Sequence, residues 1–200
     1  FGITAKDIIL RIIGDIGVGG AAGHVIEYTG EAIRSLSMEG RMTVCNMSIE
    51  AGGRAGMVAP DETTFEYLRG RPFAPQGDAW DAALSHWRTL PSHPDAHFDT
   101  ELHLDASEVV PPIPWGVSLD QVAPVAGTIP DEPGDTAGAK AHRQALDYMG
   151  LEAGSKIAST PIDRVFIGSC ANGRLSDLER AAQVVAGRRV AEGVEAWVVP

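Results

Sequence analysis

The last quarter of the chain carries the pattern that most restricts its fold. Residues 164–168 predict a short strand, and residues 169–174 predict a tight polar turn. An amphipathic helix follows at 175–186, and a second apolar strand is predicted at 194–200. Strands that alternate with helices in this way pack in layers, so the sequence predicts an α/β fold.

The rest of the chain is predicted from caps, glycines and hydrophobic periodicity. Thr4 is expected to cap a first helix that stops at Gly14, and Ser37 to cap a helix closed by Gly52 and Gly53. Strict alternation of apolar and polar residues predicts a half-exposed strand at 98–105. We expect further strands at 24–28 and 57–59, and helices at 5–13, 38–51, 62–69, 78–90 and 139–149.

A stretch rich in Pro and Gly, residues 111–138, suggests a division of the chain. We expect an α/β region at 1–110, a loop or linker at 111–138, and a strand-turn-helix-strand region at 139–200. The three parts could equally form one domain, since 200 residues suit one domain or two small ones.

Charge and cysteine content exclude several classes of protein. Sixteen Lys and Arg against 27 Asp and Glu give a net charge of −11, which argues against nucleic acid and anionic membrane as partners. Two cysteines far apart form no disulfide framework, so a cytoplasmic location is expected. The chain begins at Phe1 and finishes on an apolar strand, which suggests a piece of something longer.

A glycine-rich segment from Gly14 to His24 invites comparison with phosphate-binding loops, but it lacks their spacing and their Lys. Two interpretations remain open. The segment is either a turn where backbones pass closely or a loop that lines a ligand site. His24 is likewise either structural or functional.

Cys170 lies just past the carboxyl end of a predicted strand and near the start of a helix. Backbone N–H groups and the helix dipole stabilise a thiolate at such a position, where α/β proteins also bind ligands. A thiolate there suits a nucleophile or a metal ligand, and a small buried cysteine is the alternative.

Asn46 and Glu50 are four residues apart in the predicted helix 38–51, so they would share a face. By themselves they fit a solvated polar stripe as well as a site. Met42, Cys45 and Ile49 would form an apolar face directed at the core.

Several segments resemble the aconitase superfamily and, within it, the large-subunit family of bacterial 3-isopropylmalate dehydratases. Residues 164–182 resemble the superfamily's cluster-binding segment, and residues 35–71 contain Asn-Met-Ser-Ile-Glu, a form typical of that branch. His24 and the run Ala-Pro-Asp-Glu-Thr-Thr-Phe-Glu-Tyr also favour it. Ala171 departs from the usual Thr, and Gly-Gly-Ala-Ala-Gly-His departs from the common form of the glycine loop. Further collinear matches lie at 2–10, 23–41, 114–122 and 145–154.

The resemblance implies an aconitase-type α/β/α domain, with a mixed sheet flanked by helices, in a hydro-lyase of leucine biosynthesis that carries a [4Fe–4S] cluster. Such an enzyme interconverts 2- and 3-isopropylmalate by dehydration and rehydration, and one cluster iron acts as a Lewis acid. The resemblance implies that Cys170 is a cluster ligand, that Asn172 contacts the cofactor, and that Asn46 and Glu50 are catalytic. Two further cysteine ligands would lie downstream of this chain, and a serine base on a separate small subunit.

Two alternatives accompany this reading. Homoaconitase or citraconate-forming relatives share the same motifs. By itself the chain would be an inactive fragment without its cluster, a folded module that contacts the rest of the enzyme.

Overall fold

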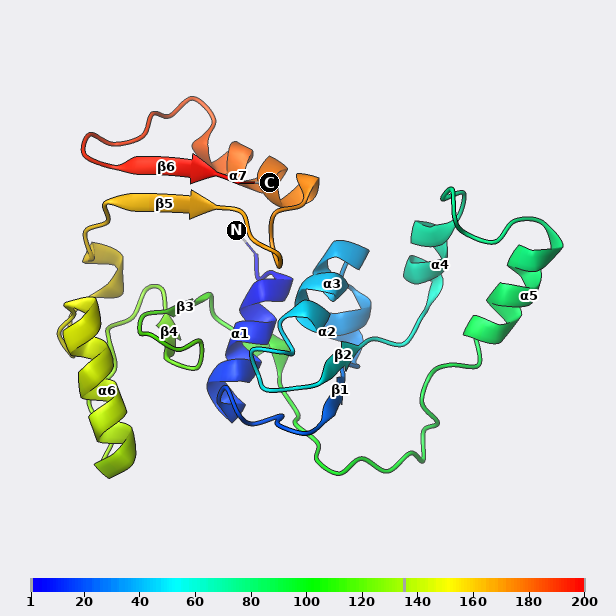
Figure 1. Ribbon diagram of the computed structural model, residues 1–200, viewed down its shortest axis with the longest axis horizontal. Helices are drawn as coiled ribbons and strands as arrows, with labels where there is room; N and C mark the ends of the chain where they lie inside the picture. The colour runs from blue at the N-terminus through cyan, green and yellow to red at the C-terminus, as the bar shows by residue number, and fades with distance from the viewer. Residues whose placement is uncertain (1, 135, 200) are drawn as a thin grey trace.

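The computed structural model describes residues 2–134 and 136–199. Phe1, Asp135 and Pro200 lie outside the described residues, so the strand expected at 194–200 and the stretch 111–138 are described without them. A central block of helices holds α1, and an arm formed by α4 and α5 extends from it to one side (Figure 1). Helix α6 lies on the opposite side, and the unit of β5, α7 and β6 lies above the central block.

The first helix, α1 (Ala5–Ile16), begins as the sequence predicts. The Thr4 hydroxyl accepts the Asp7 N–H at 3.4 Å, and the Asp7 carboxylate accepts the Thr4 N–H at 2.7 Å, which closes a capping box. The helix does not stop at Gly14, as expected, but at Gly17, where φ is 79°. Gly14 instead packs against the Val122 side chain, so its lack of a side chain serves a helix-to-hairpin contact and not a helix end.

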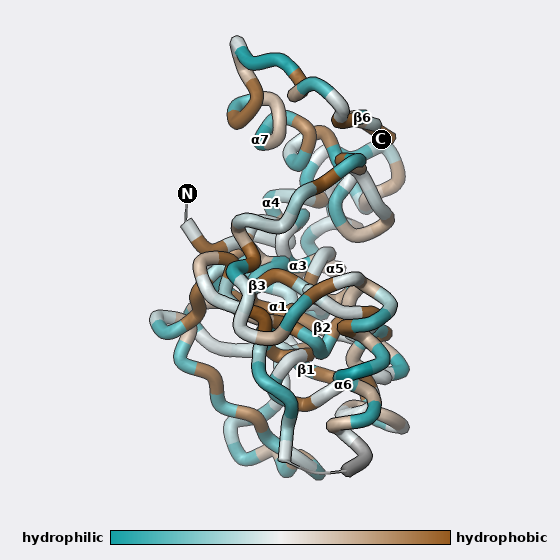
Figure 2. Tube along the Cα trace, turned by 90° about the vertical axis from the view of Figure 1, so that its left-hand side faces the viewer, coloured by the Kyte–Doolittle hydropathy of each residue, from teal (hydrophilic) through white to brown (hydrophobic). Residues whose placement is uncertain are grey.

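The central block is built on α1, whose apolar stripe is the core. Strand β1 (Val25–Glu27) pairs in parallel with β2 (Ala55–Met57), and α2 (Glu31–Arg34) and α3 (Met38–Asn46) lie between them in the chain. Ser37 caps α3 as predicted, accepting the Gly40 N–H at 3.2 Å. The hydrophobic stretches of the trace gather around α1, as Figure 2 shows. Ala171, from the far end of the chain, belongs to the same buried cluster as Ile9, Ile13, Val44, Met47 and Ala51.

Helix α3 is shorter than the predicted helix 38–51. It ends at Asn46, and residues 47–52 form consecutive turns. The Gly53 N–H reaches back to the Ser48 carbonyl at 2.9 Å, while the buried Ser48 hydroxyl bonds Tyr28 Oη at 2.8 Å. These bonds reverse the chain into β2, which a continued helix would prevent. Ile49 is 68% exposed and therefore does not join Met42 and Cys45 in the expected apolar face.

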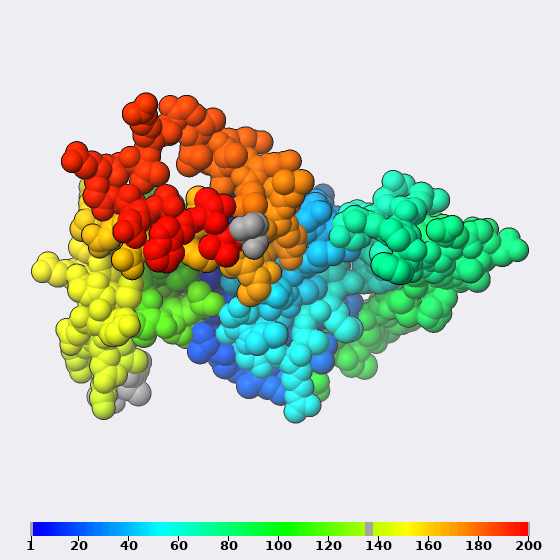
Figure 3. All heavy atoms as spheres, turned by 45° about the horizontal axis from the view of Figure 1, so that its top comes forward, coloured from blue at the N-terminus to red at the C-terminus, as the bar shows by residue number. Residues whose placement is uncertain are grey.

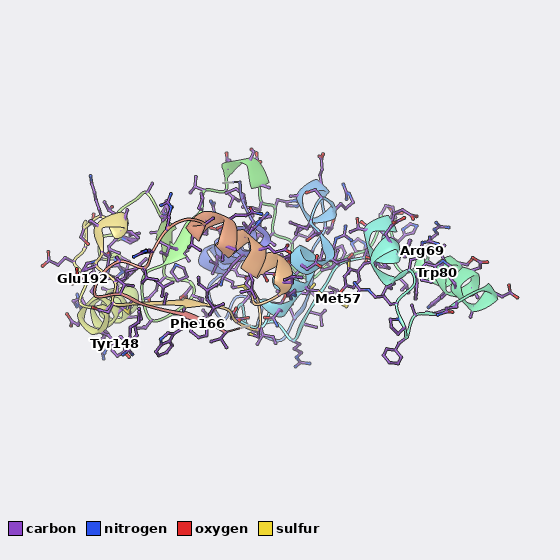
Figure 4. The ribbon with its side chains drawn as sticks, turned by 90° about the horizontal axis from the view of Figure 1, so that it is seen from above. Met57, Arg69, Trp80, Tyr148, Phe166 and Glu192 are labelled. Atoms are coloured by element: carbon purple, nitrogen blue, oxygen red, sulfur yellow. The ribbon has the colours of Figure 1, made fainter. Side chains whose placement is uncertain are left out.

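The arm carries its own aromatic cluster. Helix α4 (Glu62–Leu68) is capped by Asp61, and it faces α5 (Asp78–Trp87). Trp87 stacks on Phe65 at 6.1 Å and meets the edge of Trp80 at 5.6 Å, both between ring centroids. The Arg69 guanidinium lies 5.1 Å from the centre of the Trp80 ring, and both residues are labelled in Figure 4.

The strand expected at 98–105 is absent from the described residues, which is a correction. The segment has no regular secondary structure and pairs with no strand among residues 2–134 and 136–199, and Phe98 and Leu102 are 47% and 51% exposed. A segment with alternating apolar and polar residues forms a strand only where the edge of another strand is free to pair with it. Asp105 instead caps a short 3₁₀ helix, η1 (Ala106–Glu108).

The Pro/Gly-rich stretch 111–138 is not all loop. Strands β3 (Pro112–Pro114) and β4 (Val122–Pro124) pair antiparallel within it, next to α1. A second hydrophobic core is formed by Trp115, Ala123, Ile129, Ala145 and Ile157. It joins the hairpin to α6 (Thr136–Met149), which Gly150 follows at φ 64°, and to η2 (Ile157–Ser159).

The α/β prediction is confirmed. Strand β5 (Arg164–Ile167) pairs in parallel with β6 (Glu195–Val198), and α7 (Leu175–Val185) connects them. Across residues 2–134 and 136–199 the strands form three two-stranded sheets, two parallel and one antiparallel, flanked by helices. Among the helices described, none has both the length and the apolar character that crossing a membrane requires.

Candidate functional site

The turn between β5 and α7 places Cys170 at the surface. Gly168 adopts φ 129°, and a side chain there would collide with the Val199 carbonyl oxygen, so only glycine suits this exit from β5. The Asn172 N–H donates to Ser169 Oγ at 2.9 Å, which tightens the turn. Cys170 is exposed, as its predicted place after the strand suggested.

The end of α3 meets this turn, although 124 residues separate the two in sequence. Cys170 Sγ lies 3.9 Å from Asn46 Oδ1, within the range of a weak thiol hydrogen bond. Thr43, one turn earlier on α3, donates to the Ala171 carbonyl at 3.0 Å. In Figure 3 the orange surface of the α7 region lies directly against the blue and cyan surface of the central block. The structure therefore brings together two of the four predicted site residues, Cys170 and Asn46.

Asn172, the residue expected to contact the cofactor, is held from one side only. Its Nδ2 donates to Asp177 Oδ1 at 3.0 Å, and its buried Oδ1 has no hydrogen-bond partner within the described parts of the chain. Buried amide oxygens are normally satisfied, so this one is available to a donor that the structure does not contain.

Glu50 does not share a helix face with Asn46, which corrects the sequence interpretation. It lies in the turns that follow α3, and no hydrogen bond among residues 2–134 and 136–199 joins it to Asn46 or Cys170. Its Oε2 is buried and, in the same residues, has no partner. A half-buried carboxylate with a free oxygen is an acceptor for an incoming proton donor.

The glycine-rich segment packs backbone against backbone on the turns that carry Glu50. The Ala21 N–H donates to the Ala51 carbonyl at 2.9 Å, and a Cβ on Gly52 would lie 3.0 Å from the Val18 carbonyl oxygen. These contacts favour the interpretation of closely passing backbones. His24 is exposed, and its Nδ1 lies 3.0 Å from the Ala22 carbonyl oxygen.

Cys45 differs from Cys170 in environment. It is half-buried beside Gly56, and burial raises the pKa of its thiol. It was predicted to lie in the core, but it is only half-buried and belongs to neither buried cluster of the described residues.

Sequence reasoning missed three residues that build the site: Thr43, Arg174 and Asp177. Arg174 Nη1 donates to the Ala171 carbonyl at 2.7 Å, and Asp177 holds the Asn172 amide and the Arg174 N–H. One signal was present in the sequence. A cation at the start of a helix faces the positive end of the helix dipole, so Arg174 needs a compensating role.

The donors suit one part of a metal-cluster site. An exposed thiol lies beside the Asn46 amide, and Asn172, two residues further along the chain, has a buried amide oxygen without a partner among the described residues. Within the described residues no three His, Cys, Asp or Glu side chains gather as a complete ligand set. Cys170 therefore fits the role of a single thiolate ligand, oriented by its neighbours.

Comparison with known protein families gives one finding. The model of the aconitase family (aconitate hydratase) matches residues 1–200. Members of this family are hydro-lyases and usually bind a [4Fe–4S] cluster. A match over the whole sequence, together with the α/β fold, shows that this chain belongs to the aconitase family.

Proposed function

We propose that this chain is part of the large subunit of a [4Fe–4S] hydro-lyase that interconverts 2- and 3-isopropylmalate in leucine biosynthesis. The family membership supports a hydro-lyase. The choice of substrate is supported by His24 and by the segment Asn46-Met47-Ser48-Ile49-Glu50, which have the form typical of the isopropylmalate branch.

One observation carries the proposal. Cys170 and Asn46, far apart in sequence, lie 3.9 Å apart at the surface of the molecule. A thiolate ligand and a hydrogen-bonding amide are the two kinds of group that a cluster needs at its edge. Their convergence is an arrangement that a solvated polar stripe does not require.

In the proposed site, Cys170 would hold one iron, and the remaining thiolates would come from a Cys-x-x-Cys pair elsewhere in the complete subunit. The cluster, when bound, supplies a Lewis acid that weakens the bond to the departing hydroxyl. The Asn172 amide, fixed by Asp177, would donate or accept at the edge of the cluster.

The two remaining residues act on the substrate side. Asn46 presents an amide beside the thiol and would orient the hydroxyl group of the substrate. Within the described residues the buried Glu50 Oε2 has no partner, so in rehydration it would accept a proton from water. In dehydration the Glu50 carboxyl would return that proton to the departing hydroxyl, which leaves as water. A serine base on a small subunit would take the proton from the neighbouring carbon, so the complete enzyme is a two-subunit assembly.

A substrate panel tests the proposal. The complete large subunit is purified anaerobically, combined with its small subunit, and assayed with 2-isopropylmalate, homoaconitate-type and citraconate-type acids. We expect kcat/KM for 2-isopropylmalate to exceed the others by at least about 10-fold, a difference that pocket contacts with the isopropyl group can provide.

Each outcome of the panel decides between the alternatives. A higher kcat/KM for the homoaconitate or citraconate type would show that the chain belongs to an enzyme acting on that type of acid. A folded complex that carries a cluster and dehydrates none of these acids would overturn the proposal. Cys170→Ser is the matched control, and it should lose both cluster and activity.

A further inference from the structure

Thr43 and Arg174 both lie within hydrogen-bond distance of one backbone carbonyl next to Cys170. The Ala171 carbonyl oxygen accepts Arg174 Nη1 at 2.7 Å and lies 3.0 Å from Thr43 Oγ1. The single proton of the Thr43 hydroxyl is shared between this oxygen and the Glu39 carbonyl oxygen, which lies 3.1 Å from Oγ1. Arg174 Nη1 also lies 3.1 Å from Thr43 Oγ1, so the two side chains contact each other as well. We call Thr43, Arg174 and the Ala171 carbonyl the carbonyl clamp.

Two of the three groups of the clamp are buried although the thiol beside them is exposed, and the Arg174 side chain is 28% exposed. Thr43 is 1% exposed and Ala171 6%, and Ala171 packs in the core around α1. Away from water, hydrogen bonds are stronger than at the surface, and losing either donor leaves the Ala171 carbonyl oxygen with one donor where it had two. The carbonyl clamp therefore fixes the backbone between Cys170 and Asn172 to α3.

The position of Arg174 is electrostatically unfavourable for a cation. The residue stands at the start of α7, where the helix dipole disfavours a cation. Asp177 offsets part of this, accepting the Arg174 N–H at 3.1 Å and lying 3.9 Å from its guanidinium. The guanidinium is nevertheless directed at the Ala171 carbonyl and at Thr43, 131 residues away.

We propose that Thr43 and Arg174 are positioning residues that hold Cys170 against Asn46, through the Ala171 carbonyl, so that the thiolate is oriented before it binds iron. This inference rests on the proposed function for the identity of the ligand. The clamp itself touches neither cluster nor substrate. It acts through the peptide next to Cys170, as supporting groups act on metal ligands elsewhere.

The test uses the complete large subunit, with Arg174→Met, Thr43→Val and Thr43→Ser compared with the wild type. Val matches the shape of Thr but lacks the hydroxyl, whereas Ser keeps it. We expect Arg174→Met and Thr43→Val to lose the cluster to a chelator about 10- to 100-fold faster than the wild type. The rate of cluster loss in Thr43→Ser should stay within about 3-fold of the wild-type rate. Arg180→Met, on the exposed side of α7, is the control and should lose its cluster at the wild-type rate.

A spectroscopic measurement separates positioning from general stability. The electron paramagnetic resonance spectrum of the reduced cluster should shift in Thr43→Val and return in Thr43→Ser. Cluster loss is measured well below the unfolding midpoint of each variant. Wild-type rates and spectra in both Thr43→Val and Arg174→Met would overturn the inference, as would a Ser variant that behaves like Val. If Arg174→Met does not fold, the Thr43 pair decides alone.

A second readout needs no cluster. In the cluster-free protein, the Cys170 thiol donates to Asn46 Oδ1 and must give up that bond before it reacts. Thr43→Val should therefore raise the alkylation rate of Cys170 by about 3-fold or more and leave that of Cys45 unchanged. If the wild type binds no cluster, the proposed function fails, and this labelling still decides the clamp. Equal rates in Thr43→Val and wild type would then contradict it.

Discussion

At the scale of single residues, one buried guanidinium links the central block to the arm. Arg41 is 3% exposed, and both of its Nη atoms donate to the Asp61 carboxylate at 2.7 Å. Its Nη2 also donates to the Arg34 carbonyl at 2.8 Å. The hydrogen bond from Arg41 lowers the pKa of Asp61, so the ionised carboxylate is stabilised in the folded protein.

Asp61→Asn should lower the free energy of unfolding by about 2 kcal/mol at neutral pH, a value reduced because Asp61 is partly exposed. Asn caps a helix as well as Asp does, so the variant removes the charge and leaves the cap of α4. Since the folded pKa is lowered, the contribution of the ion pair is present above the unfolded pKa, about 3.9, and is lost as the pH falls through the folded value.

Denaturant unfolding of both proteins between pH 7 and pH 3 measures this difference, which should shrink in the acid range. Glu62→Gln is the control, because Glu62 pairs with Arg88 at the surface and should change stability by less than about 1 kcal/mol. A difference between wild type and Asp61→Asn that stays constant over the whole range would contradict the role of the charge.

The two cysteines should differ in reactivity. Cys170 is exposed, whereas Cys45 is half-buried and its thiol has a pKa raised by burial, so less of it is thiolate. We expect native alkylation to label Cys170 at least about 10-fold faster, as measured by mass spectrometry of the labelled peptides. Equal rates, or faster labelling of Cys45, would show that the turn 169–174 is covered.

The site was partly predictable at this scale. The place of Cys170 after a strand predicted its exposure, and the resemblance to a family singled out Asn46. No local pattern could place Thr43 beside Ala171, because their hydrogen bond joins residues 128 positions apart. Such contacts depend on how the chain folds back on itself and not on neighbouring residues.

At the scale of elements, the starts of the side-chain-capped helices were predictable, and the ends of α1 and α3 were not. Thr4, Ser37 and Asp61 cap the helices that follow them, since a cap depends on a side chain and the N–H groups just after it. The ends of α1 and α3 depend on packing instead. Helix α1 continues through Gly14, which lies against Val122, and α3 ends before Ser48, whose hydroxyl bonds Tyr28.

The contact between α3 and β2 gives a prediction for Gly56. A Cβ there would lie 2.8 Å from Cys45 Cα and 3.0 Å from the Cys45 carbonyl oxygen, and backbone cannot move aside cheaply. Gly56→Ala should destabilise the protein by about 2–3 kcal/mol and shift the end of α3 that carries Asn46.

The denaturation midpoint of Gly56→Ala, set beside that of Gly19→Ala, measures this effect. Gly19 has nothing within 4 Å of its added Cβ, so its variant should stay within about 0.5 kcal/mol of the wild type. Similar midpoints for the two variants would mean that β2 does not press on α3.

At the scale of the whole molecule, the buried apolar side chains form two separate cores, and the arm has an aromatic cluster of its own. One core surrounds α1, the second lies between the β3–β4 hairpin and α6, and the arm packs on its own aromatic rings. The unit of β5, α7 and β6 lies above them, with Phe166 and Trp197 half-exposed (Figure 1). The sequence predicted the α/β class but not this arrangement, because hydrophobic periodicity shows which face is apolar and not what covers it.

This 200-residue chain by itself should take up little iron. Cys170 alone cannot encircle a cluster, and within the described residues no larger group of ligands surrounds it. Iron and sulfide per chain after anaerobic reconstitution should fall far below one cluster. About four iron atoms per chain, with the visible absorbance of a cluster, would show that ligands outside this chain are not required.

The activity per assembled cluster of Glu50→Gln, in the complete two-subunit enzyme, tests the central claim most directly. The substitution keeps the shape of the side chain and removes the charge that accepts a proton. We predict a fall of about 10²–10⁴-fold with 2-isopropylmalate at unchanged cluster content, and a smaller fall for Asn46→Ala. Glu66→Gln, on the exposed side of α4, should match the wild type. Wild-type activity per cluster in Glu50→Gln would contradict the claim that the turns after α3 form a wall of the active site.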